Sequence, residues 1–161
     1  MLTLVLDTNV VLDWLVFREP LLADFTNAVQ AGRVNVLTHD AVSYELRRVL
    51  SYPALKLDAS QQGGVYSLYQ SLCREAVVPR GFNAQNLLLP EGFPKCRDPD
   101  DQLFLAMTLH TKADALVSRD KAVLALRKKA LKFGVTILDL EQMLEKVVIS
   151  ARKWGQSETD V

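Results

Sequence analysis

Apolar residues along this chain follow two patterns: short continuous runs, and longer stretches in which they recur every three or four positions. Four of the runs are nearly continuous and rich in branched aliphatic residues: Leu2–Leu6, Val34–Leu37, Ala115–Val117 and Val135–Leu138. Such runs are typical of strands buried on both faces of a parallel sheet. Because helical stretches separate them, the sequence predicts a three-layer α/β/α sandwich with helices on both sides of a central parallel sheet.

The helical spacing fills most of the chain between these runs. We expect helices after a cap at Thr8 or Asn9, over Leu21–Gln30, up to Leu50, over Ser60–Ala76, from Asp98, over Lys121–Leu131 and over Leu140–Val148. Val77 and Val78 predict a short extended piece, and the glycines and prolines of residues 80–97 predict a loop. The length predicts one domain, residues 1–150, followed by a frayed tail, residues 151–161.

Composition excludes few functions. Lys+Arg and Asp+Glu are balanced at 19 each, so any binding to nucleic acid has to come from local patches. Cys73 and Cys96 lack zinc-ligand spacing, and we expect them to be reduced. The apolar N-terminus lacks the basic region of a signal peptide, and no run reaches the roughly 18 apolar residues of a membrane span. We therefore expect a cytoplasmic protein without a membrane segment.

Two aspartates follow predicted strands directly or nearly so. Asp7 ends the first run, and Asp120 comes shortly after Val117, behind Ser118 and Arg119. Ligands of open α/β sheets bind in the crevice outside the carboxyl ends of the strands, so both carboxylates are placed for chemistry. Taken singly, either residue is more often a helix cap or a turn former than a catalyst.

Further acids come from two predicted helices. Asp98, Asp100 and Asp101 gather at the start of one helix, where the positive end of the helix dipole favours acids in any case. Asp98 and Asp101 share a face, and Asp101 is the better-aimed ligand. Glu45 lies in the middle of another helix; alone it would usually be a solvated residue, but its helix begins close to a strand end.

Four segments resemble the acidic motifs of the PIN-domain family, in the order of that family: LDTNV (6–10), SYELRRVL (43–50), RDPDDQLFLA (97–106) and LVSRD (116–120). The resemblance covers about residues 1–140. Within the family, the chain is similar above all to the toxin components of toxin-antitoxin modules. It implies a sheet of order 3-2-1-4-5 and metal-dependent cleavage of single-stranded RNA.

The resemblance also implies roles for individual residues. Asp7, Glu45, Asp101 and Asp120 would be the catalytic, metal-binding acids, with Asp98 as a candidate fifth. Asn9 would orient Asp7, and Ser118 stands where the family often has threonine. Whether Asp98 or Asp100 shares the role of Asp101 stays open at this point.

The chemistry of four carboxylates points to a hard cation. Carboxylates drawn together without one repel each other, and at least one pKa would have to rise. Oxygen-only ligands select Mg²⁺ or Mn²⁺ rather than zinc. No side chain is an obvious general base, because His39 and His110 lack triad partners and are expected to be ordinary, partly exposed histidines.

RNA binding requires cations beside this acidic site. Arg47 and Arg48 follow Glu45, and Arg119 precedes Asp120, so these three arginines are the candidates for RNA contact. A basic run is equally compatible with RNA contact and with a solvated helix face: Arg127, Lys128, Lys129 and Lys132. Three aromatic residues are expected in the core: Trp14, Phe17 and Tyr44.

Other functions fit the sequence less well. A phosphatase of the haloacid-dehalogenase type needs a second aspartate where this chain has Asn9, and a phosphoacceptor receiver domain needs an acidic pair near the start of the chain. The alternative from another class is a non-catalytic PIN-like module bound by an antitoxin or another protein. As partners we expect RNA, an antitoxin whose cation enters the acidic site, and a second copy. Val10–Val16 and Phe17 are a candidate surface for that copy, although we expect most of these side chains to be buried in the core.

Overall fold

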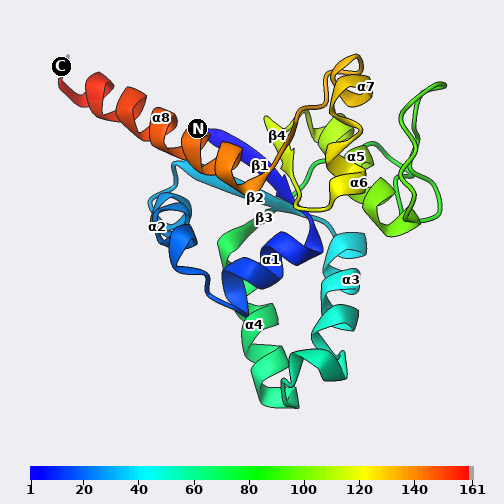
Figure 1. The fold of residues 1–161 in the computed structure, drawn as a ribbon, viewed down its shortest axis with the longest axis horizontal. Helices are drawn as coiled ribbons and strands as arrows, with labels where there is room; N and C mark the ends of the chain where they lie inside the picture. The colour runs from blue at the N-terminus through cyan, green and yellow to red at the C-terminus, as the bar shows by residue number, and fades with distance from the viewer. Residues whose placement is uncertain (160–161) are drawn as a thin grey trace.

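Five parallel strands form a single sheet in the computed structural model of the chain, which describes the backbone of residues 1–159 and the side chains of residues 1–156. The strands are β1 (Leu2–Leu6), β2 (Val34–Thr38), β3 (Cys73–Glu75), β4 (Ala115–Val117) and β5 (Ile137–Leu138). Their order is β3-β2-β1-β4-β5, with β1 in the centre (Figure 1). The parallel sheet and the 3-2-1-4-5 order are therefore confirmed.

Helices cover both faces of the sheet. They are α1 (Thr8–Leu15), η1 (Pro20–Leu22), α2 (Ala23–Gln30), α3 (Asp40–Leu50), η2 (Pro53–Leu55), α4 (Ala59–Leu72), α5 (Pro99–Thr111), α6 (Lys121–Leu124), α7 (Arg127–Leu131) and α8 (Leu140–Thr159). Successive residues of β1 face opposite layers, as strand geometry requires. Leu4 and Leu6 pack with α1, α2 and α8, whereas Val5 packs with α5 (Figure 1). Three layers result, as expected.

Three element boundaries differ from the prediction. Helix α4 ends at Leu72, and the third strand is Cys73–Glu75 rather than the extended piece at Val77 and Val78. The helix expected over Lys121–Leu131 is broken in two, because the N–H of Leu126 bonds to Val123 O in a tighter turn. Strand β5 starts late because the N–H of Val135 bonds back to α7, at Ala130 O, instead of joining the ladder.

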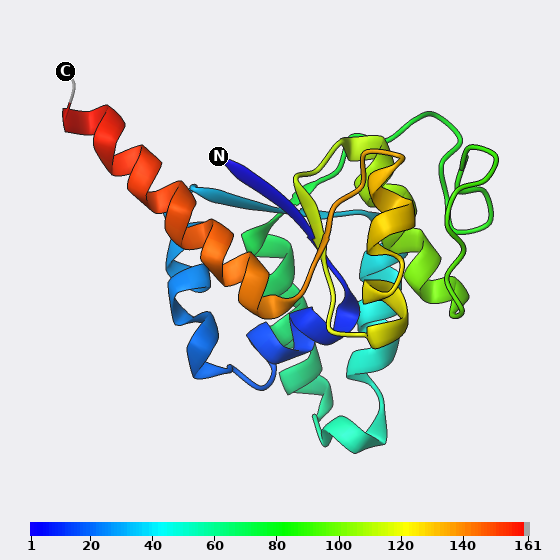
Figure 2. The same cartoon turned by 45° about the horizontal axis from the view of Figure 1, so that its top comes forward.

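The C-terminal helix, α8, is longer than predicted. It was expected to end at Val148, but it continues to Thr159, so most of the segment expected to be a frayed tail is helical. The remaining two residues of that segment, 160–161, lie outside the described residues. The second half of α8 extends well beyond the sheet (Figure 2). Across the described residues, no helix has the length and apolar character needed to cross a membrane.

Two of the three aromatic residues expected in the core are exposed. Trp14 is buried, but Phe17 is 51 % exposed and Tyr44 is 73 % exposed. Helix α3 turns Val42 and Leu46 toward the core, and a residue two positions after Val42 lies roughly 200° around the helix from it. Tyr44 therefore points outward, while Phe17 lies beyond the end of α1.

Candidate functional site

A pocket of about 290 Å³ lies where the carboxyl ends of the central strands meet the first turns of the helices that follow. Carboxylates from four separate segments line it: Asp7, Glu45, Asp98, Asp100, Asp101 and Asp120. The structure thus brings together all four acids of the predicted site, together with Asp98 and Asp100. The chain's two histidines do not line the pocket, and both are partly buried, as expected.

Asp7 is the most buried acid of the pocket, with 4 % of its surface exposed. It caps α1 itself, a role that the sequence assigned to Thr8 or Asn9: Val10 N–H donates to its Oδ1 at 3.0 Å. The Ser118 hydroxyl donates to its Oδ2. Burial raises the pKa of Asp7, although these two hydrogen bonds oppose the rise. Asn9 lines the pocket with an exposed side chain, and its expected role in orienting Asp7 stays a prediction.

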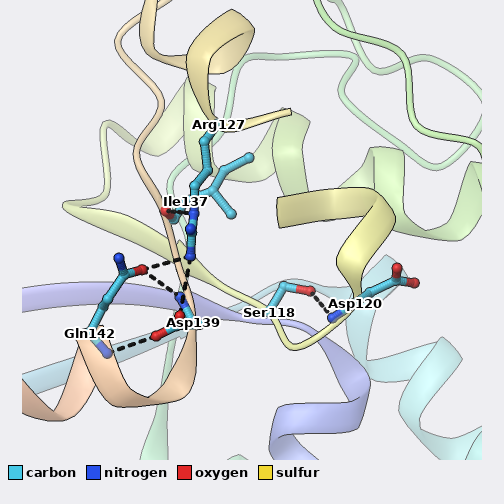
Figure 3. Close-up of polar contacts among 6 residues, drawn as sticks. All are labelled: Ser118, Asp120, Arg127, Ile137, Asp139 and Gln142. Atoms are coloured by element: carbon cyan, nitrogen blue, oxygen red, sulfur yellow. Dashed lines mark hydrogen bonds and ion pairs between the residues drawn. The ribbon is translucent and has the colours of Figure 1, made fainter. Parts of the chain in front are cut away.

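Ser118 links Asp7 to Asp120. Its side chain is fully buried, and its Oγ accepts the N–H of Asp120 at 3.1 Å (Figure 3). Asp120 in turn caps α6, because its Oδ1 accepts the N–H of Ala122 at 2.8 Å. One hydroxyl therefore fixes the positions of two acids that lie 113 residues apart in the sequence.

Glu45 enters the pocket from α3 and is half-buried. Burial, and then the neighbouring Asp100 carboxylate, raise its pKa to about 7. Thr8 weakly opposes this rise, but the two side chains fall short of hydrogen-bond geometry, and Glu45 Oε2 and Thr8 Oγ1 are both buried without a partner. A buried oxygen without a hydrogen bond is costly, which makes Glu45 a natural point for a ligand to bind.

The three aspartates at the start of α5 have different surroundings. Asp98 caps the helix and accepts the N–H of Asp100 at 2.9 Å, while the carboxylate of Asp100 pairs with Arg48 at 3.0 Å. Among the described residues, Asp101 neither caps the helix nor forms an ion pair. Burial, and then Asp98, raise its pKa to about 6. Of the three, Asp101 is the acid left with an uncompensated charge, which favours it as the ligand.

The arginines nearest the pocket are engaged by residues other than the four acids. Arg48 pairs with Asp100, and Arg119 pairs at 3.1 Å with the mostly buried Asp13 of α1. Arg47 lies over the ring of Tyr66, at 4.9 Å from its centroid. Over residues 1–156, the ion pairs include none of the four predicted metal-site acids. The pocket is therefore strongly negative.

The pocket fits an oxygen-preferring divalent cation in kind, because all of its charged side chains are carboxylates and one buried carboxylate oxygen lacks a partner. Within the described part of the chain, no three acidic, histidine or cysteine side chains are grouped closely enough to hold one ion. Mg²⁺ usually keeps several waters and takes only one or two carboxylates directly, so acids spread around a pocket suit it.

Arg127, from the predicted basic run, has a structural role. It donates to Gln142 Oε1 at 2.7 Å and to Ile137 O at 3.3 Å, and it pairs with Asp139 at 3.4 Å (Figure 3). These contacts fasten α7 to the start of α8. The three lysines of the run are exposed, so a solvated helix face describes them well.

The apolar wall of the pocket was not predicted from the sequence. It is formed by Leu12, Val49, Tyr52, Ala54, Leu55 and Phe104. The signal was in the sequence, because Val49 and Tyr52 follow Glu45 at positions four and seven, which a helix places on one face. Tyr52 lies just beyond the end of α3, yet it continues this face.

Comparison with known proteins identifies the family of the chain. A family model described as the PIN domain matches residues 3–122, roughly three quarters of the chain. The chain belongs to the PIN-domain family, whose members are in general metal-dependent nucleases. Comparisons with curated proteins and with solved structures gave no significant match.

Proposed function

We propose that the chain is a Mg²⁺- or Mn²⁺-dependent ribonuclease that hydrolyses phosphodiester bonds of single-stranded RNA. The observation that supports this most is the convergence of Asp7, Glu45, Asp101 and Asp120 on one pocket without an ion pair to any of them. A fold requires no such accumulation of charge, and it costs stability in the absence of a cation.

In the proposed reaction, Asp7 and Asp120 hold the cation directly, and Glu45 and Asp101 complete its surroundings. A bound divalent cation supplies Lewis-acid activation of the attacking water and of the phosphate. Ser118 joins the Asp7 carboxylate to the backbone of Asp120, because its hydroxyl donates to Asp7 and accepts the Asp120 N–H. The Thr8 hydroxyl, buried in the pocket lining without a partner, is available to donate to a phosphate oxygen.

The direct test is cleavage of a fluorescently labelled single-stranded RNA by the purified protein. We expect cleavage with Mg²⁺ or Mn²⁺, loss of cleavage in EDTA, and loss in the Asp101→Asn variant. Glu91→Gln, a change in an exposed loop outside the pocket, is the control. Binding of RNA without metal-dependent cleavage would refute the proposal and favour the non-catalytic module.

The biological role that we propose is that of a cytoplasmic toxin held inactive by an antitoxin protein. A net negative pocket bordered by Arg48 and Arg119 suits a peptide that carries a cationic side chain with acids beside it. Expression of the chain alone should stop growth of a bacterial host, whereas the Asp7→Asn variant should not. Unchanged growth with wild-type protein at measurable RNase activity would refute the toxin role alone.

A further inference from the structure

The acidic pocket has two chemically different halves. One half carries the carboxylates, and the other is the apolar wall that includes Val49, Tyr52, Ala54 and Leu55. A metal site needs the first half only. An apolar surface that stays open to solvent beside a charged site is typical of a place where part of a ligand is bound.

Tyr52 is the part of this wall that is best suited to an aromatic ligand. Its side chain is 45 % exposed. Its backbone is held between Val49 and Leu55, because the Tyr52 N–H bonds to Val49 O and the Leu55 N–H bonds to Tyr52 O, both at 3.0 Å. Pro53 restricts the Tyr52 backbone further, to the extended region in which it lies. The ring is thus presented from a fixed turn.

We propose that Tyr52 and the apolar wall form a nucleobase subsite, in which a base next to the scissile phosphate stacks on the Tyr52 ring. This inference rests on the proposed ribonuclease function and deepens it. Base stacking on an aromatic side chain is sequence-tolerant, since every base has a π-face. It requires a base that is not stacked within a duplex, so the subsite gives this pocket a preference for single strands.

Two tyrosines provide a matched test, one within α3 and one just beyond its end. Tyr52 lines the pocket, whereas Tyr44, in the middle of α3, is 73 % exposed and does not line it. With RNA as the substrate, Tyr52→Ala should raise KM by about 5- to 150-fold, the range that the loss of one base stack corresponds to. Tyr52→Trp should retain a KM near that of the wild type, and Tyr44→Ala should change neither KM nor kcat.

Binding measurements separate stacking from a structural effect. In the Asp7→Asn background, fluorescence anisotropy would compare a short single-stranded RNA with the same RNA carrying one abasic position. Removing the base should weaken binding to protein with Tyr52 and have no effect in Tyr52→Leu, which keeps an apolar side chain of the wall. Equal losses in both proteins, or a KM unchanged in Tyr52→Ala, would overturn the subsite. Failure of the wild type to cleave RNA would instead overturn the proposed function.

A second inference rests on α8 and is independent of the pocket. A groove of about 720 Å³ has an apolar lining of Leu21, Leu140, Leu144, Val148 and Ile149, together with Glu141 and Glu145. Val148 is 44 % exposed and Ile149 is 53 % exposed. The α8 residues of the groove all lie in the first half of that helix, whose second half extends beyond the sheet (Figure 2). The apolar residues of α1, the other candidate for a dimer surface, are buried, as expected for most of them.

Charges along α8 determine which partner fits this groove. On its outward side, Glu141 and Glu145 come first, Val148 and Ile149 follow, and Arg152 comes last. The spacing of positions 141, 145, 148 and 152 places them in one stripe of a helix. Two such helices in antiparallel orientation, with a two-fold axis near Val148, bring Glu145 opposite the partner's Arg152. A parallel arrangement would instead bring like charges together.

We infer that α8 is the interface of a symmetric dimer of this chain. An interface of this kind is isologous, so each dimer contains the Glu145–Arg152 pair twice, on either side of an apolar centre. The two charged residues are exposed in the single chain, as they must be if a second copy pairs with them.

Charge reversal tests this arrangement. By light scattering at high micromolar concentration, wild-type protein should have twice the mass of the 18.0 kDa chain. Glu145→Arg alone and Arg152→Glu alone should each shift the protein toward monomer, and the double variant should restore the dimer. Lys146→Glu, an exposed change outside the stripe, should leave the dimer intact. A monomeric wild type, or a dimer that both single reversals leave unchanged, would overturn the inference, and the latter result would point to another dimer surface.

Discussion

Asp7 and Asp139 occupy the same local position in the fold but have opposite electrostatic surroundings. Each comes directly after a strand and caps the helix that follows: Asp7 accepts Val10 N–H at 3.0 Å, and Asp139 accepts Gln142 N–H at 2.8 Å. Asp139 is also paired with Arg127 at 3.4 Å, and its own N–H donates to Gln142 Oε1 at 3.1 Å (Figure 3). Asp7 is in no such ion pair with a described residue: burial raises its pKa most, and the nearby Arg119, which lowers it, is paired with Asp13.

This difference separates a structural acid from a functional one. At the end of β5 the chain supplies the cation itself, so the charge of Asp139 is neutralised and contributes to the fold. At the end of β1 the nearby arginines pair with Asp13 and Asp100 instead. The charge of the pocket is left to be neutralised from outside the chain, which is what a metal-dependent site requires.

The largest expected effect is the loss of activity in Asp7→Asn. Asparagine caps a helix about as well as aspartate, so the fold should persist while the charge is removed. Cleavage of single-stranded RNA should fall by at least about a hundredfold, since metal affinity and activation are both lost. Asp139→Asn is the matched control and should retain wild-type rates. Equal losses in the two variants would remove the distinction between the two strand ends.

A change at Asp139 should do the reverse and lower stability without lowering activity. Asp139→Ala removes the cap of α8 and its pair with Arg127, and it should lower the free energy of unfolding by about 1–2 kcal/mol. Urea titration with EDTA present measures this effect. RNA cleavage at a temperature well below the unfolding transition should be unaffected. Asp7→Asn should be as stable as the wild type or more stable in the same titration, because it relieves repulsion in the pocket.

A smaller effect is expected in the pH dependence of stability. The pKa of Glu45 is raised from 4.5 to about 7, so the folded protein binds this proton more tightly than the unfolded chain. Without metal, this residue therefore lowers the free energy of unfolding as the pH rises from about 4.5 to 7. Glu45→Gln should match the wild type near pH 4 and be more stable at pH 8. Thermal melts across that range, with Glu91→Gln as control, would show no divergence if Glu45 titrates normally.

Much of the fold was predictable because buried strands and amphipathic helices leave strong periodic signals. Leu2–Leu6 was identified within its observed bounds. The boundaries that failed depend on contacts between elements: Val135 has a strand-like sequence, but its N–H is taken by Ala130 O. The sequence around Val148 likewise carries no signal that distinguishes a helix end from the long α8.

Which residues line the pocket was predictable in part. Asp7 and Asp120 follow strands, and the crevice rule alone brings such residues together. Helix geometry favoured Asp101 among the three aspartates of α5, but the pairing of Asp100 with Arg48, 52 positions away in the sequence, was not predictable. The pairing of Arg119 with Asp13 was missed for the same reason. Ion pairs between residues far apart in the sequence produce no periodic pattern from which they could be predicted.

The measurement that tests the central claim most directly is calorimetric titration of Mn²⁺ into the wild type and Asp7→Asn at pH 7, in two buffers of different ionisation enthalpy. Glu45 and Asp101, with pKa values of about 7 and about 6, carry protons for part of the time at this pH. Metal binding should therefore release protons, and the observed heat should depend on the buffer. In Asp7→Asn the affinity should fall at least about tenfold. Absence of Mn²⁺ binding by the wild type, or equal affinity in the two proteins, would contradict the claim that these acids form a metal site.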